Sequence, residues 1–350
     1  MKILYSVLAD YGLNPELLKI EIIKTGLINN TWKVKDSDTA YIFQRINDAV
    51  FKEPGHIAWN IQLIAAYLAQ HYPEYVFVAP LTSCNGEQLV YREGAGGGYF
   101  RLFPFVAGSH SKEVLETPEQ AYEAATQFGR FTKLLSGFDV SDLQITLPFF
   151  HDLSYRYEQF LEALQKGNRE RIRESYELIN IIKQQSDIVT VFNSIKQSEA
   201  FKQRVTHHDT KISNVLFNNE GKGLCVIDLD TVMPGYFISD VGDMMRTYLS
   251  PVSEEEKDFT KIEVRNDFYK AIVKGYYGEM ENELTDKEKT FFFYSGKFMI
   301  YMQALRFLTD HLNNDVYYGA KYPGNNFVRA NNQIVLLQRL IEKEAVLTVY

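Results

Sequence analysis

The sequence is poor in cysteine and has no long apolar run. Its 350 residues include two cysteines, Cys84 and Cys225, which form no CxxC pair. Neither a zinc site built on paired cysteines nor a disulfide framework is therefore indicated. No stretch of about 18 uncharged apolar residues occurs, the length that a membrane-spanning helix needs. We therefore expect no membrane partner.

Clustered positive charge is also missing. The formal net charge is −8, and the 37 Lys and Arg residues are spread along the chain. A nucleic-acid partner is not expected, because binding to a phosphate backbone needs clustered Lys and Arg. The apolar run in the N-terminal MKILYSVLADYG is too short for a signal peptide, which favours a cytoplasmic enzyme. An acidic protein can still bind a nucleotide when a metal ion supplies the positive charge.

The first part of the chain favours β-strands. Short β-branched or aromatic runs separated by turn residues predict strands at 19–24, 31–35, 40–46, 75–80, 87–93 and 98–106. Apolar residues at helical spacing predict a helix over 57–68. The glycines at 94–98 lack the Lys-Ser or Lys-Thr pair of a phosphate-binding loop, so a hairpin tip is expected there.

Helical patterns dominate after Gly108. Thr117 followed by Pro118 predicts a helix start, and residues 155–197 are mostly helical in pattern. The acidic run at 253–258 (SEEEKD) predicts a second, solvated helix start.

A capping box of Thr285 and Glu288 predicts the start of a long helix that is apolar, and therefore buried, on nearly every face. Together these patterns predict a mixed α+β fold. A small sheet-rich lobe over residues 1–107 precedes a larger helical lobe over residues 108–350.

A polar loop between two apolar edges stands out in VTHHDTKISNVLF, residues 205–217. After Asn214 the strand VLF, the turn NNEGKG and the strand LCVID predict a hairpin whose far end carries Asp228. A hairpin brings its ends together, so we expect Asp209 and Asn214 beside Asp228. Carboxylate and amide oxygens without thiolates favour Mg²⁺ or Mn²⁺, and Mg²⁺ typically shares such ligands with a nucleotide phosphate chain.

Two motifs carry a family resemblance. His207-x-Asp209-x₄-Asn214, followed by Ile227-Asp228-x-Asp230, resembles the aminoglycoside phosphotransferase and choline kinase family. The resemblance implies a protein-kinase-like fold with a small antiparallel N-terminal sheet and a helical C-terminal lobe. The family usually has glycine where this chain has His208, which is a departure.

A longer match narrows the expected reaction. The stretch DTVMPGYFISDVGDMMR, residues 230–246, is similar to the N-acetylhexosamine 1-kinase branch of this family. That likeness implies transfer of the γ-phosphoryl group of Mg-ATP to the anomeric C1 hydroxyl of N-acetylglucosamine or N-acetylgalactosamine. The product is the sugar 1-phosphate, and the cofactor is Mg²⁺.

The resemblance also implies roles for the motif residues. Asp209 acts as the catalytic base toward the sugar hydroxyl, while Asn214 and Asp228 hold Mg²⁺ against the phosphates. The residues expected to support them without touching the reacting atoms are His207, Asp230 and Asp240. For Asp230 the alternative is a ligand of a second metal ion, and we favour the supporting role. His208 is either exposed or directed at the substrate, and Lys211 is either solvated or in contact with a phosphate or the substrate.

The nucleotide is expected to lie against the N-terminal lobe. The segment at 26–31 resembles the family's nucleotide loop and offers Gly26, Asn29, Asn30 and Thr31. Either Gln44 or Arg45 faces the phosphates, because side chains alternate along a strand, and we favour Arg45. Phe103 and Phe105 are expected beside the adenine. The following helix offers no obvious glutamate to pair with the basic residue.

Polar side chains at the end of the long apolar helix are candidates for the sugar site. Arg306, Asp310 and His311 are costly to bury unless they pair or bind a ligand, and an Arg306–Asp310 pair is the alternative. The aromatic loop that follows adds substrate-binding candidates, since rings pack on the apolar faces of sugars: Tyr317, Tyr318 and Asn326.

Two other functions stay open. The first is a kinase of the same fold for choline, homoserine, another sugar or an aminoglycoside. The second is a nucleotide-binding regulator without turnover, although Asp209, Asn214 and Asp228 are all retained. The sequence leaves open the preferred hexosamine, ATP against GTP, the number of metal ions and the oligomeric state.

Overall fold

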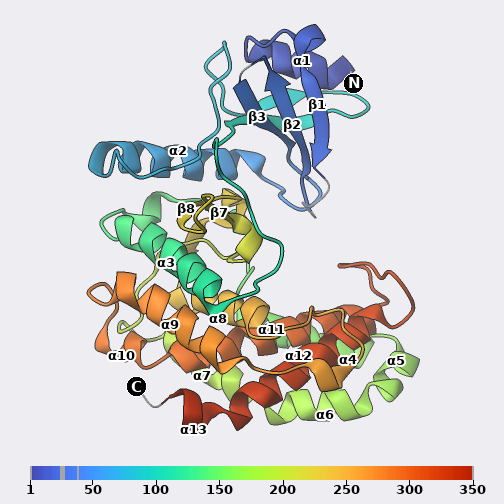
Figure 1. Cartoon of the computed structure of the whole chain (residues 1–350). Helices are drawn as coiled ribbons and strands as arrows, with labels where there is room; N and C mark the ends of the chain where they lie inside the picture. Colours follow the sequence, from blue (N-terminus) through green and yellow to red (C-terminus); the bar gives the residue numbers. More distant parts are fainter. Residues whose placement is uncertain (1, 24–27, 38, 349–350) are drawn as a thin grey trace. The chain divides into compact units, whose positions relative to one another are not determined.

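The computed structural model describes residues 2–23, 28–37 and 39–348 (Figure 1). The chain divides into two compact units, each made of three segments. The first contains Met1–His110, Gly137–Pro148 and Leu216–Pro234, and the second contains Ser111–Ser136, Phe149–Val215 and Gly235–Tyr350. The sheet lies in the first unit and most helices lie in the second, so the predicted α+β class is confirmed. The lobe boundary at residues 107 and 108 stays a prediction.

The first unit is built on a five-stranded antiparallel sheet with the order β1-β2-β3-β5-β4. Its strands are β1 (Lys19–Ile23), β2 (Asn30–Asp36), β3 (Thr39–Arg45), β4 (Val90–Arg92) and β5 (Gly98–Pro104). Five of the six predicted strands are thus confirmed. Arg92 pairs with Gly98, which confirms a hairpin tip between them.

The prediction of a strand at 75–80 is wrong. This segment runs without regular structure to Pro80, which has no N–H to donate to a neighbouring strand. Leu81 then donates its N–H to the carbonyl of Leu102 on β5, at 2.7 Å. The aromatic and β-branched residues of the segment therefore form no ladder of their own.

Helices cover the sheet and join it to later segments of the same unit. α1 (Lys2–Asp10) buries Val7 and Leu8 in a core with Phe43 and Phe100 of the sheet. α2 (Pro54–His71) confirms the predicted helix, and its buried Asn60 donates to the carbonyls of Gln144 and Val232. The remaining elements are η1 (Pro15–Leu17), η2 (Val140–Asp142), η4 (Leu229–Thr231) and β8 (Gly223–Val226).

Two strands stand where the chain passes between the units. They are β7 (Val215–Phe217), which pairs with β8 in a two-stranded sheet, and β9 (Met233–Gly235). The pairing of β7 with β8 confirms the predicted hairpin.

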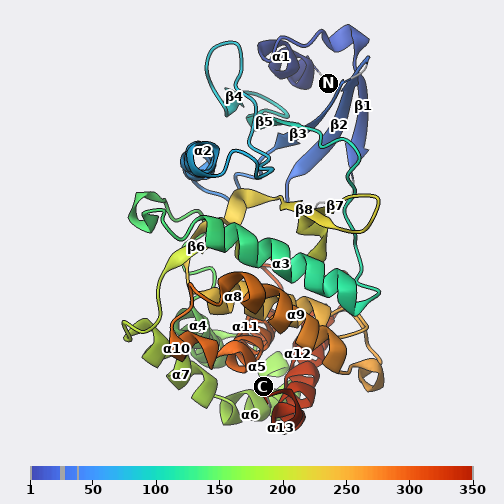
Figure 2. The same ribbon diagram turned by 60° about the vertical axis from the view of Figure 1, so that its left-hand side comes forward.

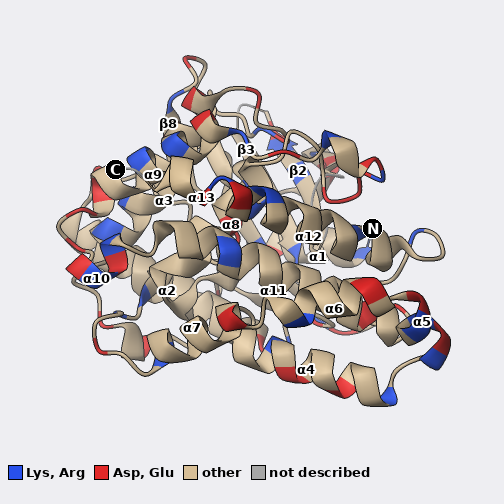
Figure 3. Ribbon diagram, turned by 90° about the horizontal axis from the view of Figure 1, so that it is seen from below, with Lys and Arg blue, Asp and Glu red and all other residues tan. Residues whose placement is uncertain are grey.

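The second unit is helical. Its elements are α3 (Pro118–Leu134), α4 (Leu153–Lys166), α5 (Arg169–Glu174), α6 (Tyr176–Gln184), α7 (Asp187–Lys196), β6 (Arg204–Thr206), η3 (Ile212–Asn214), α8 (Phe237–Tyr248), η5 (Phe259–Lys261), α9 (Asn266–Met280), α10 (Asp286–Lys289), α11 (Phe292–Leu312), α12 (Asn325–Glu342) and α13 (Glu344–Leu347). α3 packs on α9 (Figure 2), and α11 packs on α12, α8 and α4. Residues of positive and negative charge are interspersed along α4, α5 and α6 (Figure 3).

α11 is the buried central helix that the sequence predicts, with buried side chains on all sides. The Thr285–Glu288 capping box also forms, but it begins the short α10. α11 is a separate helix that begins at Phe292. In the part of the chain that the structure describes, no helix has both the length and the apolarity to cross a membrane.

The acidic run at 253–258 is not the solvated helix start that its composition predicts. Residues 253–257 are irregular, and Asp258 caps only the single turn of η5. Glu254 forms ion pairs with Arg246 of α8 and Arg329 of α12. Through Glu254 this acidic segment therefore links two helices of the second unit.

Candidate functional site

Asp240 of α8 anchors the loop that follows β6. Its carboxylate accepts the backbone N–H of His207 at 3.0 Å and that of His208 at 2.7 Å. Asp240 is fully buried, and burial raises its pKa to about 7 although both N–H donors act in the opposite direction. These two bonds fix the backbone that leads into Asp209.

A second carboxylate anchors the same loop one residue after Asp209. Asp243 accepts the N–H of Thr210 at 2.8 Å, and the hydroxyl of Tyr248 donates to the Thr210 carbonyl at 2.5 Å. Arg246 in turn donates to Asp243 at 2.9 Å. The sequence interpretation missed Asp243, although its spacing of three from Asp240 places both carboxylates on one face of a helix.

His207 is a packed residue with no exposed surface. The rings of Phe128 and Phe131 meet it edge to face, at centroid distances of 5.1 and 6.2 Å. Its Nδ1 also accepts the N–H of Asp209 at 3.3 Å. Packing and this bond together orient the start of the loop.

His208 is buried, so the exposed alternative is excluded. Its φ is 66°, in the left-handed region where glycine is favoured, and the ring lies against Gly235. A Cβ on Gly235 would come within 2.5 Å of the His208 ring, so glycine is needed there. The Nδ1 atoms of His208 and His151 are 3.2 Å apart and share a hydrogen bond.

Asp209 and Asn214 are the polar side chains that this framework presents. Lys211 forms an ion pair with Asp209 at 3.0 Å, and the Asn214 amide donates to the Asp209 carbonyl at 2.8 Å. Because the amide nitrogen is used, the Oδ1 atom of Asn214 is the one available to a cation. An amide oxygen suits a hard divalent ion, so Asn214 fits the predicted Mg²⁺.

In the first unit, Asp228 directly precedes η4 with φ 61° and ψ 61°. A left-handed conformation is uncommon for a residue with a side chain and is often found at functional positions. Asp230, two residues later, is buried and engaged by two side chains. Arg101 lies 2.5 Å from it and Asn29 donates to it at 2.7 Å.

Arg101 is a basic residue that the sequence interpretation missed. It lies on β5 opposite Gln44 of β3, whose side chain accepts from its guanidinium at 2.8 Å. Arg45, the residue favoured for the phosphates, lies over Gly98 on the other face of the strand pair. Gln44 and Arg101 therefore share the face that leads to Asp230. A buried arginine within the apolar run GYFRLFPFV is the signal that could have found it.

The other predicted nucleotide residues lie near the same strands. Asn30 and Thr31 pair with β3, and Thr31 accepts a hydrogen bond from Gln44 at 3.2 Å. Phe103 on β5 has the Arg101 guanidinium over its ring at 4.9 Å, and Phe105, just after β5, has the Lys33 ammonium over its ring at 3.8 Å. Gly26 lies outside the described residues.

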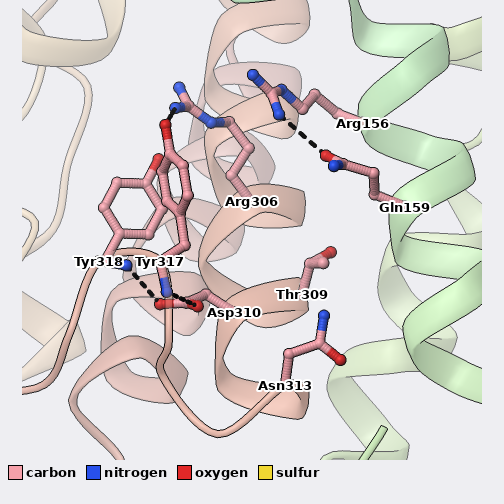
Figure 4. A pocket seen from close by; sticks show the side chains of 8 residues that line it. All are labelled: Arg156, Gln159, Arg306, Thr309, Asp310, Asn313, Tyr317 and Tyr318. Atoms are coloured by element: carbon pink, nitrogen blue, oxygen red, sulfur yellow. Dashed lines mark hydrogen bonds between the residues drawn. The ribbon is translucent and has the colours of Figure 1, made fainter. Parts of the chain in front are cut away.

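A pocket of about 140 Å³ opens between α4, α11 and the loop after α11 (Figure 4). The predicted Arg306–Asp310 pair is not among the ion pairs of the described residues. Asp310 instead accepts the backbone N–H groups of Tyr317 and Tyr318 at 2.7 and 2.9 Å and the amide of Asn326 at 3.1 Å. The pocket is lined by Arg156, Gln159, Arg306, Thr309, Asp310, Asn313, Tyr317 and Tyr318.

Among the described residues, no three His, Cys, Asp or Glu side chains converge as a metal-binding group. The predicted meeting of Asn214 and Asp228 at a metal ion stays a prediction.

Known proteins resemble this chain in sequence and in fold. Residues 19–270 match the phosphotransferase enzyme family, a span of more than half the chain. The chain belongs to this family. It is accordingly a small-molecule phosphotransferase of the aminoglycoside phosphotransferase and choline kinase type, as the resemblance of the two motifs implies.

Solved structures share the fold at low sequence identity. A microcompartment-associated aminopropanol kinase has a TM-score of 0.69 at 13% identity, covering 100% of this chain and 99% of its own. The amicoumacin kinase hAmiN, in complex with AMP-PNP, Ca²⁺ and Ami, has a TM-score of 0.62 at 16% identity, with 98% and 93% covered. Choline kinase from Cryptosporidium parvum Iowa II gives 0.58 at 12% identity, with 99% and 97% covered. The predicted kinase-like fold is confirmed.

Proposed function

We propose that the chain is a sugar 1-kinase. It transfers the γ-phosphoryl group of Mg-ATP to the C1 hydroxyl of N-acetylglucosamine or N-acetylgalactosamine and releases the sugar 1-phosphate. The reaction type follows from membership of the phosphotransferase family. The choice of sugar rests on the likeness of residues 206–251 to the hexosamine 1-kinase branch.

The observation that carries the proposal is that hydrogen bonds hold the backbone on both sides of Asp209. Both neighbours of Asp209 are tied through backbone N–H groups to buried carboxylates, His208 to Asp240 and Thr210 to Asp243. A residue fixed on both sides can hold its carboxylate at hydrogen-bonding distance from an acceptor hydroxyl. Asp209 then accepts the hydroxyl proton as the bond to phosphorus forms. Positioning of this kind supplies most of the protein's part in phosphoryl transfer.

Asn214 and Asp228 are the residues that would hold Mg²⁺, from the two ends of the β7–β8 hairpin. When bound, the metal neutralises charge on the phosphates of the nucleotide. Lys211, paired with Asp209, adds a positive charge beside the proposed base.

In the first unit, the contacts of Arg101, Asp230 and Asn29 support a role in positioning the nucleotide. Asn29 also accepts the N–H of Asn47, which ties the described end of the nucleotide loop to the segment after β3. Phe103 and Phe105 offer apolar faces to adenine. Arg101 replaces Arg45 as the residue best supported for the phosphate side, because it lies on the face that leads to Asp230.

A second candidate comes from the solved structures. Two of them are an aminopropanol kinase and a choline kinase, and both of these acceptors carry an amine or ammonium group. A kinase for an amino alcohol would need carboxylates or open aromatic faces in its acceptor pocket. The pocket between α4 and α11 offers Arg156 and Arg306 instead. This favours the acetamido sugar.

One experiment tests the proposed function. The purified chain is incubated with Mg-ATP and a panel of hydroxyl acceptors: both N-acetylhexosamines, glucose, choline, 1-amino-2-propanol and an aminoglycoside. ADP release identifies the acceptor, and ³¹P and ¹H NMR of the product locate the phosphate. Phosphate on C1 of the hexosamines supports the proposal. Phosphate on C6, or preferred turnover of an amine, overturns the choice of substrate while leaving a kinase.

A further inference from the structure

Three aromatic rings surround Arg306 in the pocket of the second unit. The guanidinium carbon lies 5.4 Å from the ring centre of Phe150, 5.9 Å from that of Tyr317 and 5.5 Å from that of Tyr318. We call Phe150, Tyr317 and Tyr318 the aromatic cage. Figure 4 shows Arg306 extending beside the two tyrosine rings. Cages of this kind attract cations, because the face of each ring carries negative potential.

The cage is fixed in place by the protein's own contacts. Asp310 accepts the backbone N–H groups of both Tyr317 and Tyr318, and the Tyr318 hydroxyl accepts from Gln303 at 3.1 Å. Gln303 also accepts from Arg306 at 3.2 Å. Arg306 is therefore built into the cage as a resident cation, held by a neighbour that also holds one of the rings.

Arg156 adds a second positive charge to the same pocket. Its guanidinium donates to Gln159 at 2.9 Å, and its Nε is buried without a hydrogen-bond partner. Burial lowers the pKa of Arg156, and the positive charge of Arg306, which lines the same pocket, lowers it further. Among the described residues, neither arginine forms an ion pair with a carboxylate.

We propose that this pocket is an oxygen-binding subsite that selects acceptors without a positive charge. Arg306 already occupies the cage in which an ammonium group of a substrate would lie. Arg156 and Arg306 present N–H donors that suit a carbonyl, a carboxylate or sugar hydroxyls. The proposal rests on the proposed function in one respect, that this pocket receives the acceptor. It does not depend on which acceptor is phosphorylated.

A matched acceptor series tests the selection by charge. N-acetylglucosamine, glucose and glucosamine differ at C2, where they carry an acetamide, a hydroxyl and an ammonium group. We expect kcat/KM to fall in that order, with glucosamine at least about tenfold below glucose at low salt and the difference shrinking as salt rises. Glucuronate and glycerate extend the series to anionic acceptors. Turnover of an anionic acceptor alone refutes the hexosamine but keeps the subsite, whereas preferred turnover of glucosamine, choline or aminopropanol refutes the subsite.

An equilibrium measurement tests the cage without any turnover. Arg306→Met removes the resident cation while leaving the aromatic rings, and calorimetric titration then measures the binding of choline and tetramethylammonium. We expect the variant to bind these cations about tenfold or more tightly than the wild type, in line with a vacated cation–π site. The control is Arg339→Met, the same substitution at an exposed arginine of α12 that pairs with Glu342.

The folded state of each variant is checked by circular dichroism and thermal melting before titration. Equal ammonium affinity for wild type and Arg306→Met contradicts the resident-cation role. Arg306→Gln provides a second variant should the methionine variant fail to fold, since it keeps polar contact with Gln303 but lacks the charge. An increase in ammonium affinity for both Arg306 variants, and not for Arg339→Met, supports the proposal.

Discussion

Glu254 and Arg246 form an ion pair of 3.0 Å that joins the acidic segment at 253–258 to α8. Arg246 also holds Asp243, which accepts the N–H of Thr210 next to the proposed base. On its other side Glu254 pairs with Arg329, whose guanidinium lies 3.7 Å from the ring centre of Phe307. A line of contacts within the second unit therefore runs from the loop of Asp209 through α8 and the acidic segment to α12 and α11.

Glu254 is the central carboxylate of these contacts, and replacing it breaks both of its ion pairs. We expect Glu254→Gln to lower the free energy of unfolding by about 1–3 kcal/mol, because two mostly buried arginines lose their shared partner. We also expect kcat to fall by roughly 10- to 100-fold with little change in the KM for ATP, since a loosened loop misplaces Asp209. Steady-state kinetics and urea unfolding measure both effects.

Glu255 provides the matched control. It lies on the same segment but pairs with Lys321, an exposed side chain. Glu255→Gln is expected to leave kcat unchanged and to alter stability by less than about 1 kcal/mol. If both substitutions lowered kcat equally, the loss would not come from the ion pairs of Glu254.

The buried pair of Arg101 and Asp230 gives a prediction for the first unit. Both side chains are 3% exposed, so removing one partner leaves a charge buried without compensation. Arg101→Met is expected to cost about 3–5 kcal/mol of stability, and the double variant Arg101→Met/Asp230→Leu less than that. Equilibrium unfolding in urea measures both.

The same variant separates two candidates for the phosphate side of the nucleotide. We expect Arg101→Met to raise the KM for ATP more than Arg45→Met does, because Arg45 lies over Gly98 on the opposite face. Measurements are made below the unfolding transition of each variant. A larger effect of Arg45→Met would restore the residue that the sequence favours.

The proposed role of Asp209 as catalytic base is tested by a substitution that keeps the shape of the side chain. Asp209→Asn is expected to lower kcat by about 10²–10⁴-fold, the usual cost of losing a general base. Binding of Mg-AMP-PNP, measured by calorimetry, is expected to remain near that of the wild type. Wild-type turnover by the variant would remove Asp209 from the mechanism.

The proposed metal ligand of the first unit is tested separately. Asp228→Ala removes a carboxylate that would share Mg²⁺ with the phosphates, so nucleotide affinity is expected to weaken and the Mg²⁺ concentration for half-maximal activity to rise. A magnesium titration at fixed ATP measures this. An unchanged titration curve would mean that Asp228 does not bind the metal.

Local patterns predict the elements of this fold well, because each depends on neighbours in the sequence. The strands around Trp32 and Phe43, the capping box at Thr285 and the apolar α11 all follow from spacing and residue type. A local pattern does not show whether a segment finds a partner strand. Residues 75–80 have a strand-like pattern but form no strand, and Pro80 has no N–H to donate to a ladder.

The site is less predictable, since its supporting contacts join residues far apart in the chain. Asp209 and Asn214 are recognisable from their motif, but Asp243 holds Thr210 across 33 positions and Glu254 meets Arg329 across 75. Nothing in an acidic run shows whether its carboxylates face water or buried arginines. The position of Arg306 within three aromatic rings likewise depends on the return of a loop after α11.

The hydrogen-bonded pair of His151 and His208 predicts how stability depends on pH. Burial, the neighbouring His208 and the guanidinium groups of Arg306, Arg246 and Arg156 all hold the pKa of His151 well below its usual value. The unfolded chain takes up a proton near pH 6.5, whereas the folded chain does not. The stability contributed by neutral His151 is therefore present above about pH 6.5 and is lost as the pH falls below it.

We expect the unfolding free energy of the wild type to fall between pH 7.5 and 5 by up to about 1.4 kcal/mol per pH unit for this one proton. His151→Asn keeps a polar side chain but removes the titrating ring, so its profile is expected to be flatter by that amount. The exposed His71 on α2, replaced by Asn, is the control and is expected to leave the slope unchanged. Urea unfolding at half-unit pH steps measures the three profiles, and parallel curves for wild type and His151→Asn would show that protonation of His151 does not destabilise the fold.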